Sequence, residues 1–233
     1  MRNPLTPPRR RGFEFLDAPN IDPELVKRSL GDVAKANSLF GGASSAVDEL
    51  LESANDLPRA ATLLDVGTGL GDIPAQARAA AAKKRIVLTT IGLDSARVLA
   101  SACRQSLDWA VCGDALHLPF ADNSIDLVMC SQVLHHFSGQ DALTLLREMN
   151  RVARHRVIVS DLRRSWISAA GLWLVSFPLR FHAVSRHDGV VSVMRGFTTR
   201  ELSDTVQAAV TRRPVAHRRR GFRVTTSWTP VHQ

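Results

Sequence analysis

The chain has 233 residues, of which 45% are hydrophobic and 22% are charged, and its formal net charge is +8. This length suits one large domain with a substantial core of its own, and the composition is that of a soluble globular protein. No stretch of about 20 residues is continuously apolar, so no membrane-spanning helix is predicted. No secretory signal is apparent at the N-terminus, and a cytoplasmic location is predicted.

The cysteines and the basic charge give limited information about metals and partners. Cys103, Cys112 and Cys130 form no C-x-x-C pair and have no histidine at ligand spacing, so they are predicted to be buried thiols and no metal site is predicted. A basic balance is compatible with nucleic acid, an anionic membrane surface or an acidic substrate. The arginine clusters are scattered and terminal, which favours a solvated surface. No nucleic-acid partner is therefore expected, and peripheral membrane association stays open.

The first quarter of the chain is predicted to precede the main domain. Residues 1–20 are rich in proline and arginine and are predicted to form a flexible basic arm. Residues 21–58 are predicted to form a helical cap, because the Asp-Pro-Glu sequence at 22–24 favours a helix start. A glycine pair ends that helix, and Ser44 or Ser45 is expected to cap a second one. The helical pair is placed to cover the glycine-rich turn that follows.

Residues 59–233 are predicted to form one α/β domain. Short apolar runs alternate with helical patterns, which is typical of a parallel sheet built from βα units. Strands are predicted at residues 62–66, 86–93, 109–112, 125–130 and 156–160, and helices at residues 73–83, 95–105 and 141–152. Near the end, a capping box at residues 198–201 opens another helix, and residues 211–217 and 222–228 form a predicted hairpin.

The central feature is a glycine-rich turn after the first predicted strand. Asp65 is followed by Gly67, Gly69 and Gly71, and an alanine-rich helix begins just beyond them. Glycines without Cβ atoms let the backbone adopt positive φ and let a ligand lie on the main chain, while the helix start favours a polar or anionic group. Dinucleotide-binding turns usually have the spacing G-x-G-x-x-G, whereas the glycines here alternate.

Polar residues also follow the next strands. In open α/β sheets the ligand lies across the carboxyl ends of the strands. Asp94 ends the second strand, where a carboxylate can accept both hydroxyls of a ribose, and Asp114 follows the third. Ser131 and Gln132 end the fourth. The alternative for Asp94 and Asp114 is that each caps the helix after it.

The passage from residue 63 to residue 161 resembles the class I S-adenosylmethionine (SAM)-dependent methyltransferases, in particular the small-molecule branch with the ubiquinone and menaquinone methyltransferases. The resemblance implies a Rossmann-like sheet of seven strands whose last pair is a hairpin. It implies SAM as cofactor and S-adenosylhomocysteine as product. Thr68 stands where the family often has Cys or Ser, and it keeps a hydroxyl. The cofactor-binding residues implied are Asp65, Gly67, Thr68, Gly69, Gly71, Asp94, Ser95, Asp114, Ala115, Ser131 and Gln132.

The resemblance also implies an acceptor lid, which we expect at residues 163–196. His136, just after the fourth strand, is a candidate general base, with a structural role as the alternative. Within the lid, His187 and His182 are further candidate bases, and Asp188 could orient His187. Candidate acceptor contacts are Trp166, Arg186, Asp188 and Arg195, where the two arginines could hold an acidic acceptor. Core packing or a solvated loop is the alternative for this segment.

The function predicted from these motifs is methyl transfer to a small, aromatic, phenolic or quinone-like acceptor, with O-methylation slightly favoured over C-methylation. The protein is expected to be a monomer or homodimer. Three alternatives stay open: an RNA methyltransferase, a Rossmann-type NAD(P)-dependent oxidoreductase, and a SAM-binding protein without catalysis.

Overall fold

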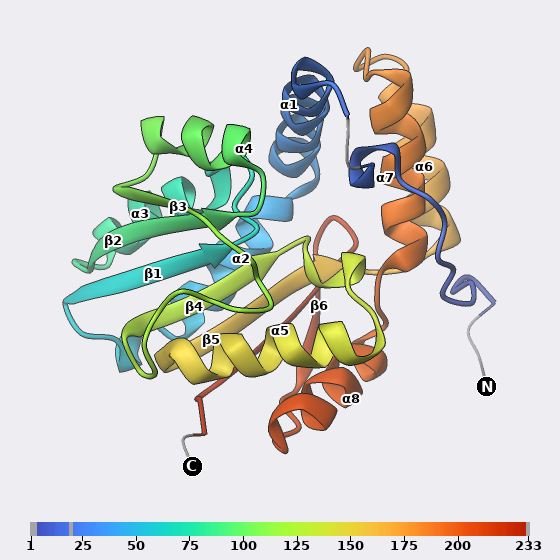
Figure 1. Cartoon of the computed structure of the whole chain (residues 1–233). Helices are drawn as coiled ribbons and strands as arrows, with labels where there is room; N and C mark the ends of the chain where they lie inside the picture. Colours follow the sequence, from blue (N-terminus) through green and yellow to red (C-terminus); the bar gives the residue numbers. More distant parts are fainter. Residues whose placement is uncertain (1–3, 19–20, 232–233) are drawn as a thin grey trace.

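The fold is built on a seven-stranded sheet with the order β3-β2-β1-β4-β5-β7-β6, in a computed structural model that describes residues 4–18 and 21–231 (Figure 1). The first five strands are parallel, and β7 is antiparallel to both β5 and β6. The predicted sheet with its terminal hairpin is therefore confirmed. The strands are β1 (Ala60–Val66), β2 (Val87–Asp94), β3 (Trp109–Cys112), β4 (Ile125–Ser131), β5 (Ala153–Leu162), β6 (Ala216–Arg219) and β7 (Arg223–Trp228).

Helices cover both faces of this sheet. Successive side chains of a strand point to opposite faces, so Leu63 and Leu64 of β1 belong to two different cores. The helices are α1 (Pro23–Phe40), α2 (Gly42–Glu52), α3 (Asp72–Lys83), α4 (Arg97–Ala102), α5 (Gly139–Val152), α6 (Trp166–Ser176), α7 (Ala183–Arg195) and α8 (Thr199–Val210). Leu64 packs with α5 and α8, whereas Leu63 packs with α2 and α3. These two pairs of helices lie on opposite faces of the sheet (Figure 1).

The predicted helix signals correspond to real caps, with one exception. Asp22 accepts a hydrogen bond of 3.0 Å from the backbone N–H of Glu24, and the capping box that opens α8 is formed. The predicted serine cap of α2 is wrong. Gly41, with φ of +72°, ends α1 and begins α2, so no loop separates the helices. The hydroxyls of Ser44 and Ser45 instead donate to the Gly41 carbonyl oxygen.

The segment expected as an acceptor lid forms two helices. α6 and α7 pack against one another beyond the carboxyl ends of the parallel strands, and α7 also contacts α1 (Figure 1). Gly189 allows the close approach of the two helices, because a Cβ there would lie 2.8 Å from Cδ2 of Leu172. This segment is therefore ordered secondary structure rather than the solvated loop that remained an alternative, and its role as a lid stays a prediction.

The N-terminal segment differs from the flexible arm expected for residues 1–20. Its described part, residues 4–18, lies along α7. The backbone N–H groups of Phe15 and Leu16 donate to the carboxylate of Asp188 at 3.0 and 2.9 Å. Glu14 is 2% exposed and accepts a hydrogen bond from Ser192. Composition alone missed this packing, because the partners lie more than 170 residues away in the chain.

Two smaller expectations have mixed outcomes. Cys103 and Cys130 are buried as predicted, but Cys112 is exposed, because it ends a short strand at the edge of the sheet. Within residues 4–18 and 21–231, no helix has the length and apolar character needed to cross a bilayer.

Candidate cofactor and acceptor sites

The glycine-rich turn joins β1 to α3, and its three glycines all have positive φ: +73° at Gly67, +55° at Gly69 and +76° at Gly71. A Cβ at Gly67 would lie 2.5 Å from Cγ2 of Val133, so this position has no room for a side chain. Around Gly69 the nearest atom to such a Cβ is 4.0 Å away, on Leu30. The backbone at Gly69 is therefore open to a ligand.

A cavity of about 90 Å³ adjoins this turn. Asp65, Thr68 and Ser131 contribute buried oxygen atoms to it, and Asp65 Oδ1, Thr68 Oγ1 and Ser131 Oγ have no hydrogen-bond partner among the described residues. Burial raises the pKa of Asp65 to about 8. Orphaned polar atoms beside an open backbone fit a polar, partly cationic ligand. The lining residues are Leu30, Val33, Ala34, Asn37, Asp65, Gly67, Thr68, Gly69, Leu70, Asp72, Ile73, Ser131 and Gln132.

The remaining predicted cofactor residues lie outside this lining. Asp94 accepts hydrogen bonds from the backbone N–H groups of Gly69, at 3.1 Å, and Ala96, at 3.0 Å, so it shapes the turn and caps the chain after β2. Asp114 is exposed and accepts from the backbone of Leu116. Neither carboxylate caps a helix, because the N-cap of α4 is Ala96, without a side-chain hydrogen bond, and a turn rather than a helix follows Asp114. Their ribose and adenine roles stay predictions. Gly71, Ser95 and Ala115 are likewise not part of the lining.

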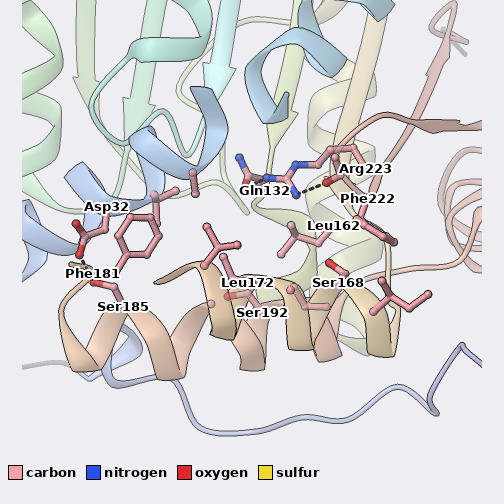
Figure 2. A pocket seen from close by; sticks show the side chains of 18 residues that line it. Asp32, Gln132, Leu162, Ser168, Leu172, Phe181, Ser185, Ser192, Phe222 and Arg223 are labelled. Atoms are coloured by element: carbon pink, nitrogen blue, oxygen red, sulfur yellow. Dashed lines mark hydrogen bonds between the residues drawn. The ribbon is translucent and has the colours of Figure 1, made fainter. Parts of the chain in front are cut away.

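A second, larger cavity of about 180 Å³ lies between α1, the helices α6 and α7, and the turn of the terminal hairpin (Figure 2). It shares Val33 and Gln132 with the first cavity, so the two adjoin. Its walls are mainly apolar. The lining residues are Asp32, Val33, Ala36, Gln132, Leu162, Ile167, Ser168, Gly171, Leu172, Val175, Phe181, Ser185, Gly189, Ser192, Val193, Gly221, Phe222 and Arg223.

A polar network stands where the two cavities meet. Nε2 of Gln132 donates to Oδ1 of Asn37 at 2.7 Å, and Nη2 of Arg223 donates to Oδ1 of Asn37 at 3.2 Å and to Oε1 of Gln132 at 3.1 Å. Gln132 has φ of +58°, a conformation that costs a non-glycine residue energy and that clusters at functional sites. No local sequence signal marks Asn37 or Arg223 as site residues, since their elements meet only in the folded chain.

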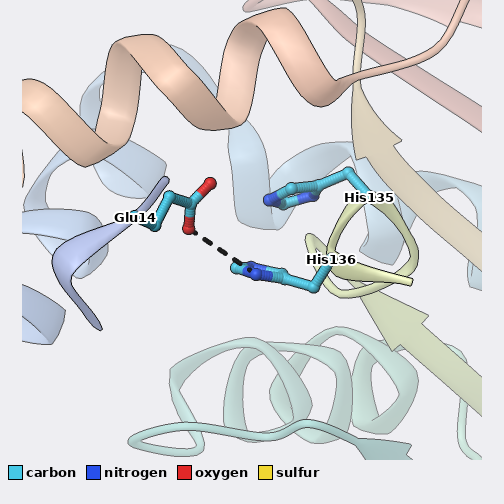
Figure 3. A group of neighbouring side chains, drawn as sticks. All are labelled: Glu14, His135 and His136. Carbon is cyan, nitrogen blue, oxygen red and sulfur yellow. Dashed lines mark ion pairs between the residues drawn. The ribbon is translucent and has the colours of Figure 1, made fainter. Parts of the chain in front are cut away.

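The paired histidines after β4 have different surroundings. His135 is 3% exposed, and its Nδ1 lies 2.7 Å from Oδ1 of the buried Asp161. His136 is exposed, and its Nδ1 lies 3.6 Å from the carboxylate of Glu14 and 3.4 Å from the guanidinium of Arg195 (Figure 3). His136 therefore belongs to a charged cluster at the N-terminal segment, and it does not line the larger cavity.

This cluster also bears on the expectation of no metal site. Glu14, His135 and His136 each offer a ligand atom, and these atoms lie within 4.8 Å of one another (Figure 3). Arg195 lies 3.1 Å from Oε1 of Glu14, so a guanidinium already supplies positive charge there. A second cation at this place would be repelled by the first.

The other predicted acceptor residues are held by contacts away from the cavity. His182 caps α7 through its own ring, and Nδ1 of His187 lies 2.9 Å from Asp188. The guanidinium of Arg186 stacks 4.2 Å from the ring centroid of Phe177. Trp166, 44% exposed, lies near Arg10. Of the predicted catalytic and acceptor residues, namely His136, His182, His187, Trp166, Arg186, Asp188 and Arg195, none lines the larger cavity.

Solved structures with the same fold include a SAM-dependent methyltransferase from Aquifex aeolicus, with a TM-score of 0.59 at 16% identity over 91% of this chain and 100% of that one. Magnesium protoporphyrin IX methyltransferase (ChlM) from Synechocystis PCC 6803, solved with bound SAH, has a TM-score of 0.55 at 14% identity and covers 85% of this chain and 84% of its own. The fold and the glycine-rich site thus define a class I methyltransferase architecture.

Residues 64–159 match the family model of the methyltransferase domain. This match, over fewer than half of the residues, confirms the predicted methyltransferase domain for this part of the chain. The chain is also 30% identical, over 161 residues, to the biotin biosynthesis bifunctional protein BioHC of Cellvibrio japonicus, a match that covers 63% of this chain and 30% of that protein. A match of 39 residues, 46% identical, is to an uncharacterized protein of Methanocaldococcus jannaschii. The chain spans less than a third of these curated relatives.

Proposed function

We propose that the protein transfers the methyl group of SAM to a small, largely apolar acceptor. The observation that carries this proposal is the shared wall of the two cavities, in which Val33 and Gln132 border both. A donor at the glycine-rich turn and an acceptor between α1, α6 and α7 would meet at Gln132. Holding two reactants in contact supplies much of the acceleration of a displacement reaction.

Within this proposal, the smaller cavity holds the cofactor. Asp65 would lose its proton when it binds the cationic methionine part, because a nearby positive charge favours the ionised carboxylate. The open backbone at Gly69 and the hydroxyls of Thr68 and Ser131 would contact the rest of the ligand. Bound SAM supplies a methyl group activated by a sulfonium. The chain's own contribution is to orient the ligand and to exclude water. The predicted ribose contact at Asp94 would require its carboxylate to accept hydrogen bonds from the ribose in addition to those from the backbone of Gly69 and Ala96.

The larger cavity favours a small molecule over a nucleic acid. It lies between helices, and its walls are mainly apolar, with Asp32 and Arg223 as the charged lining residues. A polyanion would need an open basic groove. An acceptor of this kind presents one polar group to Gln132, which fits O-methylation better than C-methylation. We therefore propose that the protein is a small-molecule O-methyltransferase.

Two measurements test this function. Calorimetry should show binding of SAM and of S-adenosylhomocysteine, and no binding of NAD. Methyl-labelled SAM should then transfer its label to small apolar acceptors, and not to total RNA. Transfer to RNA with no transfer to any small acceptor would contradict the proposal. Intact SAM binding without turnover on either class would favour the non-catalytic alternative.

A further inference from the structure

Arg223 is a buried cation without an anionic partner. It begins β7, is 6% exposed and lines the larger cavity (Figure 2). Its guanidinium hydrogen-bonds to uncharged oxygens of Gly221, Asn37 and Gln132, and its Nε has no partner. Among residues 4–18 and 21–231, no carboxylate lies within 4.0 Å of it. Arg223 therefore retains capacity to bind an anion.

Two other arginines that are buried or partly buried have carboxylate partners. Arg164, 3% exposed, donates from Nη2 to both oxygens of Glu201, and the partly buried Arg219 binds both Glu49 and Glu52. Leaving a charge buried and unpaired is expensive. Burial lowers the pKa of Arg223 to about 10, so the guanidinium keeps its charge near neutral pH. Asp161 attracts it from a distance, but the Asp161 oxygens bind His135 and the backbone of Leu162.

The surroundings of Arg223 define what an anion there would be. Apolar side chains such as Leu172 and Phe181 line the cavity, and its second charged residue, Asp32, already accepts hydrogen bonds from Ser185 and the backbone of His182. Gln132, which Arg223 contacts, also borders the cofactor cavity. The anionic group of a ligand would therefore lie at the cofactor end, and its apolar body would extend between α1 and the packed pair of α6 and α7.

The lining of the cavity, within the described part of the chain, contains no histidine, lysine or cysteine. Its one carboxylate, Asp32, is engaged in hydrogen bonds from Ser185 and from the backbone of His182. A phenol or alcohol loses a proton when it is methylated and is helped by a base. A carboxylic acid is already ionised at neutral pH.

On the basis of the proposed function, we propose that the acceptor is an apolar carboxylic acid whose carboxylate binds Arg223 and is converted to its methyl ester. A carboxylate oxygen forms a bond to the methyl carbon as the bond from that carbon to sulfur breaks. The bonding electron pair stays on sulfur, which becomes the neutral thioether, and no proton is released. Arg223 and Gln132 orient the attacking oxygen.

Binding is measured first, because it does not depend on turnover. Octanoic, dodecanoic and naphthoic acids are compared with octanol, dodecanol and naphthol by calorimetry, on the full chain with and without S-adenosylhomocysteine. At least one acid should bind about tenfold or more tightly than the matching alcohol or naphthol, the usual effect of a charge-assisted hydrogen bond. Arg223→Gln should remove that preference. Arg220→Gln, exposed in the turn of the same hairpin, should keep it.

Two further variants separate ligand binding from folding. Arg223→Met should fold with a melting temperature equal to or above that of the wild type, since it removes a buried charge at similar volume. Asn37→Asp should place an internal carboxylate beside the guanidinium and abolish acid binding. A structural Arg223 would give the opposite result, namely a less stable Arg223→Met.

The product supplies an independent readout. Label transferred to an acid should be released as volatile methanol by mild alkali, as expected of an ester and not of an ether. The proposal is overturned if no acid binds better than its partner, or if naphthol is methylated and the acids are not. It is also overturned if Arg223→Gln weakens SAM binding and spares acid binding, because Arg223 would then serve the carboxylate of the donor. Absence of SAM binding would overturn the proposed function. Acid binding to the protein without cofactor would still test whether Arg223 binds a carboxylate.

Discussion

Nε2 of Gln132 donates a hydrogen bond of 2.7 Å to Oδ1 of Asn37, which ties helix α1 to the end of strand β4. Because Gln132 borders both cavities and Asn37 borders the smaller one, this bond fixes the junction at which the two ligands would meet. The N-terminal helix is thus part of the site and not only a cover above it.

Asn37→Ala should destabilise the protein and weaken the site. The change leaves donors of Gln132 and Arg223 unsatisfied in a buried place, which costs about 1–3 kcal/mol. For a chain of this length, each 1 kcal/mol lowers the melting temperature by about 2–4 °C. Ser38→Ala, on an exposed position of the same helix, is the control. Equal melting temperatures for the two variants would mean that water replaces the lost amide.

Gly69→Ala and Gly67→Ala should fail in different ways. Gly69 has space for a Cβ, so its substitution should cost only the strain of positive φ, about 1–2 kcal/mol, and the folded variant should lose SAM binding because the methyl group occupies the ligand's place. Gly67→Ala adds a clash with Val133 and should lower the melting temperature more. Calorimetry and thermal melting measure both effects. A Gly69→Ala protein that binds SAM normally would contradict the placement of the cofactor.

Asp65 should make stability depend on pH. Its folded pKa of about 8 exceeds its ordinary value of 3.8, so between these values the folded protein holds a proton that the unfolded chain has released. The stability that this group contributes is therefore lost as pH rises from about 4 to about 8. Asp65→Asn should remove this loss. Its melting temperature should exceed that of the wild type near pH 8, while SAM binds more weakly. Parallel stability profiles for the two proteins would contradict the buried, protonated carboxyl.

His136→Ala distinguishes a base from a structural residue. The sequence predicted a general base here, but His136 contacts Glu14 and Arg195 outside the cavity, and a carboxylate acceptor needs no base. We expect kcat at saturating acceptor to fall less than tenfold. A general base contributes about 100- to 10,000-fold, so a loss of that size would restore the catalytic role. The same assay on His182 and His187 variants tests the other two predicted bases, with the exposed His117 as the control position.

Local sequence signals determined the sheet, the glycine-rich turn and most helix boundaries. The alternation of apolar runs predicted the parallel strands, and the Thr198 to Glu201 spacing predicted a capping box that the structure contains. These features depend on interactions between residues close together in the chain, or on a periodicity that each element carries by itself. The methyltransferase class followed from the same local motifs.

The larger cavity, which we propose as the acceptor site, was decided only by tertiary structure. Its polar network joins Asn37 of α1, Gln132 after β4 and Arg223 of β7. Arg223 lies 186 residues from Asn37 and 91 residues from Gln132 in the chain. Nothing local marks Arg223 among the many arginines, because its burial depends on the antiparallel register of β7 against β5. In contrast, Arg186, Arg195 and His187 were chosen by their position in the lid segment. Their side chains are held by Phe177, Glu14 and Asp188, since the packing of α7 against the N-terminal segment determines which of its faces meets the cavity.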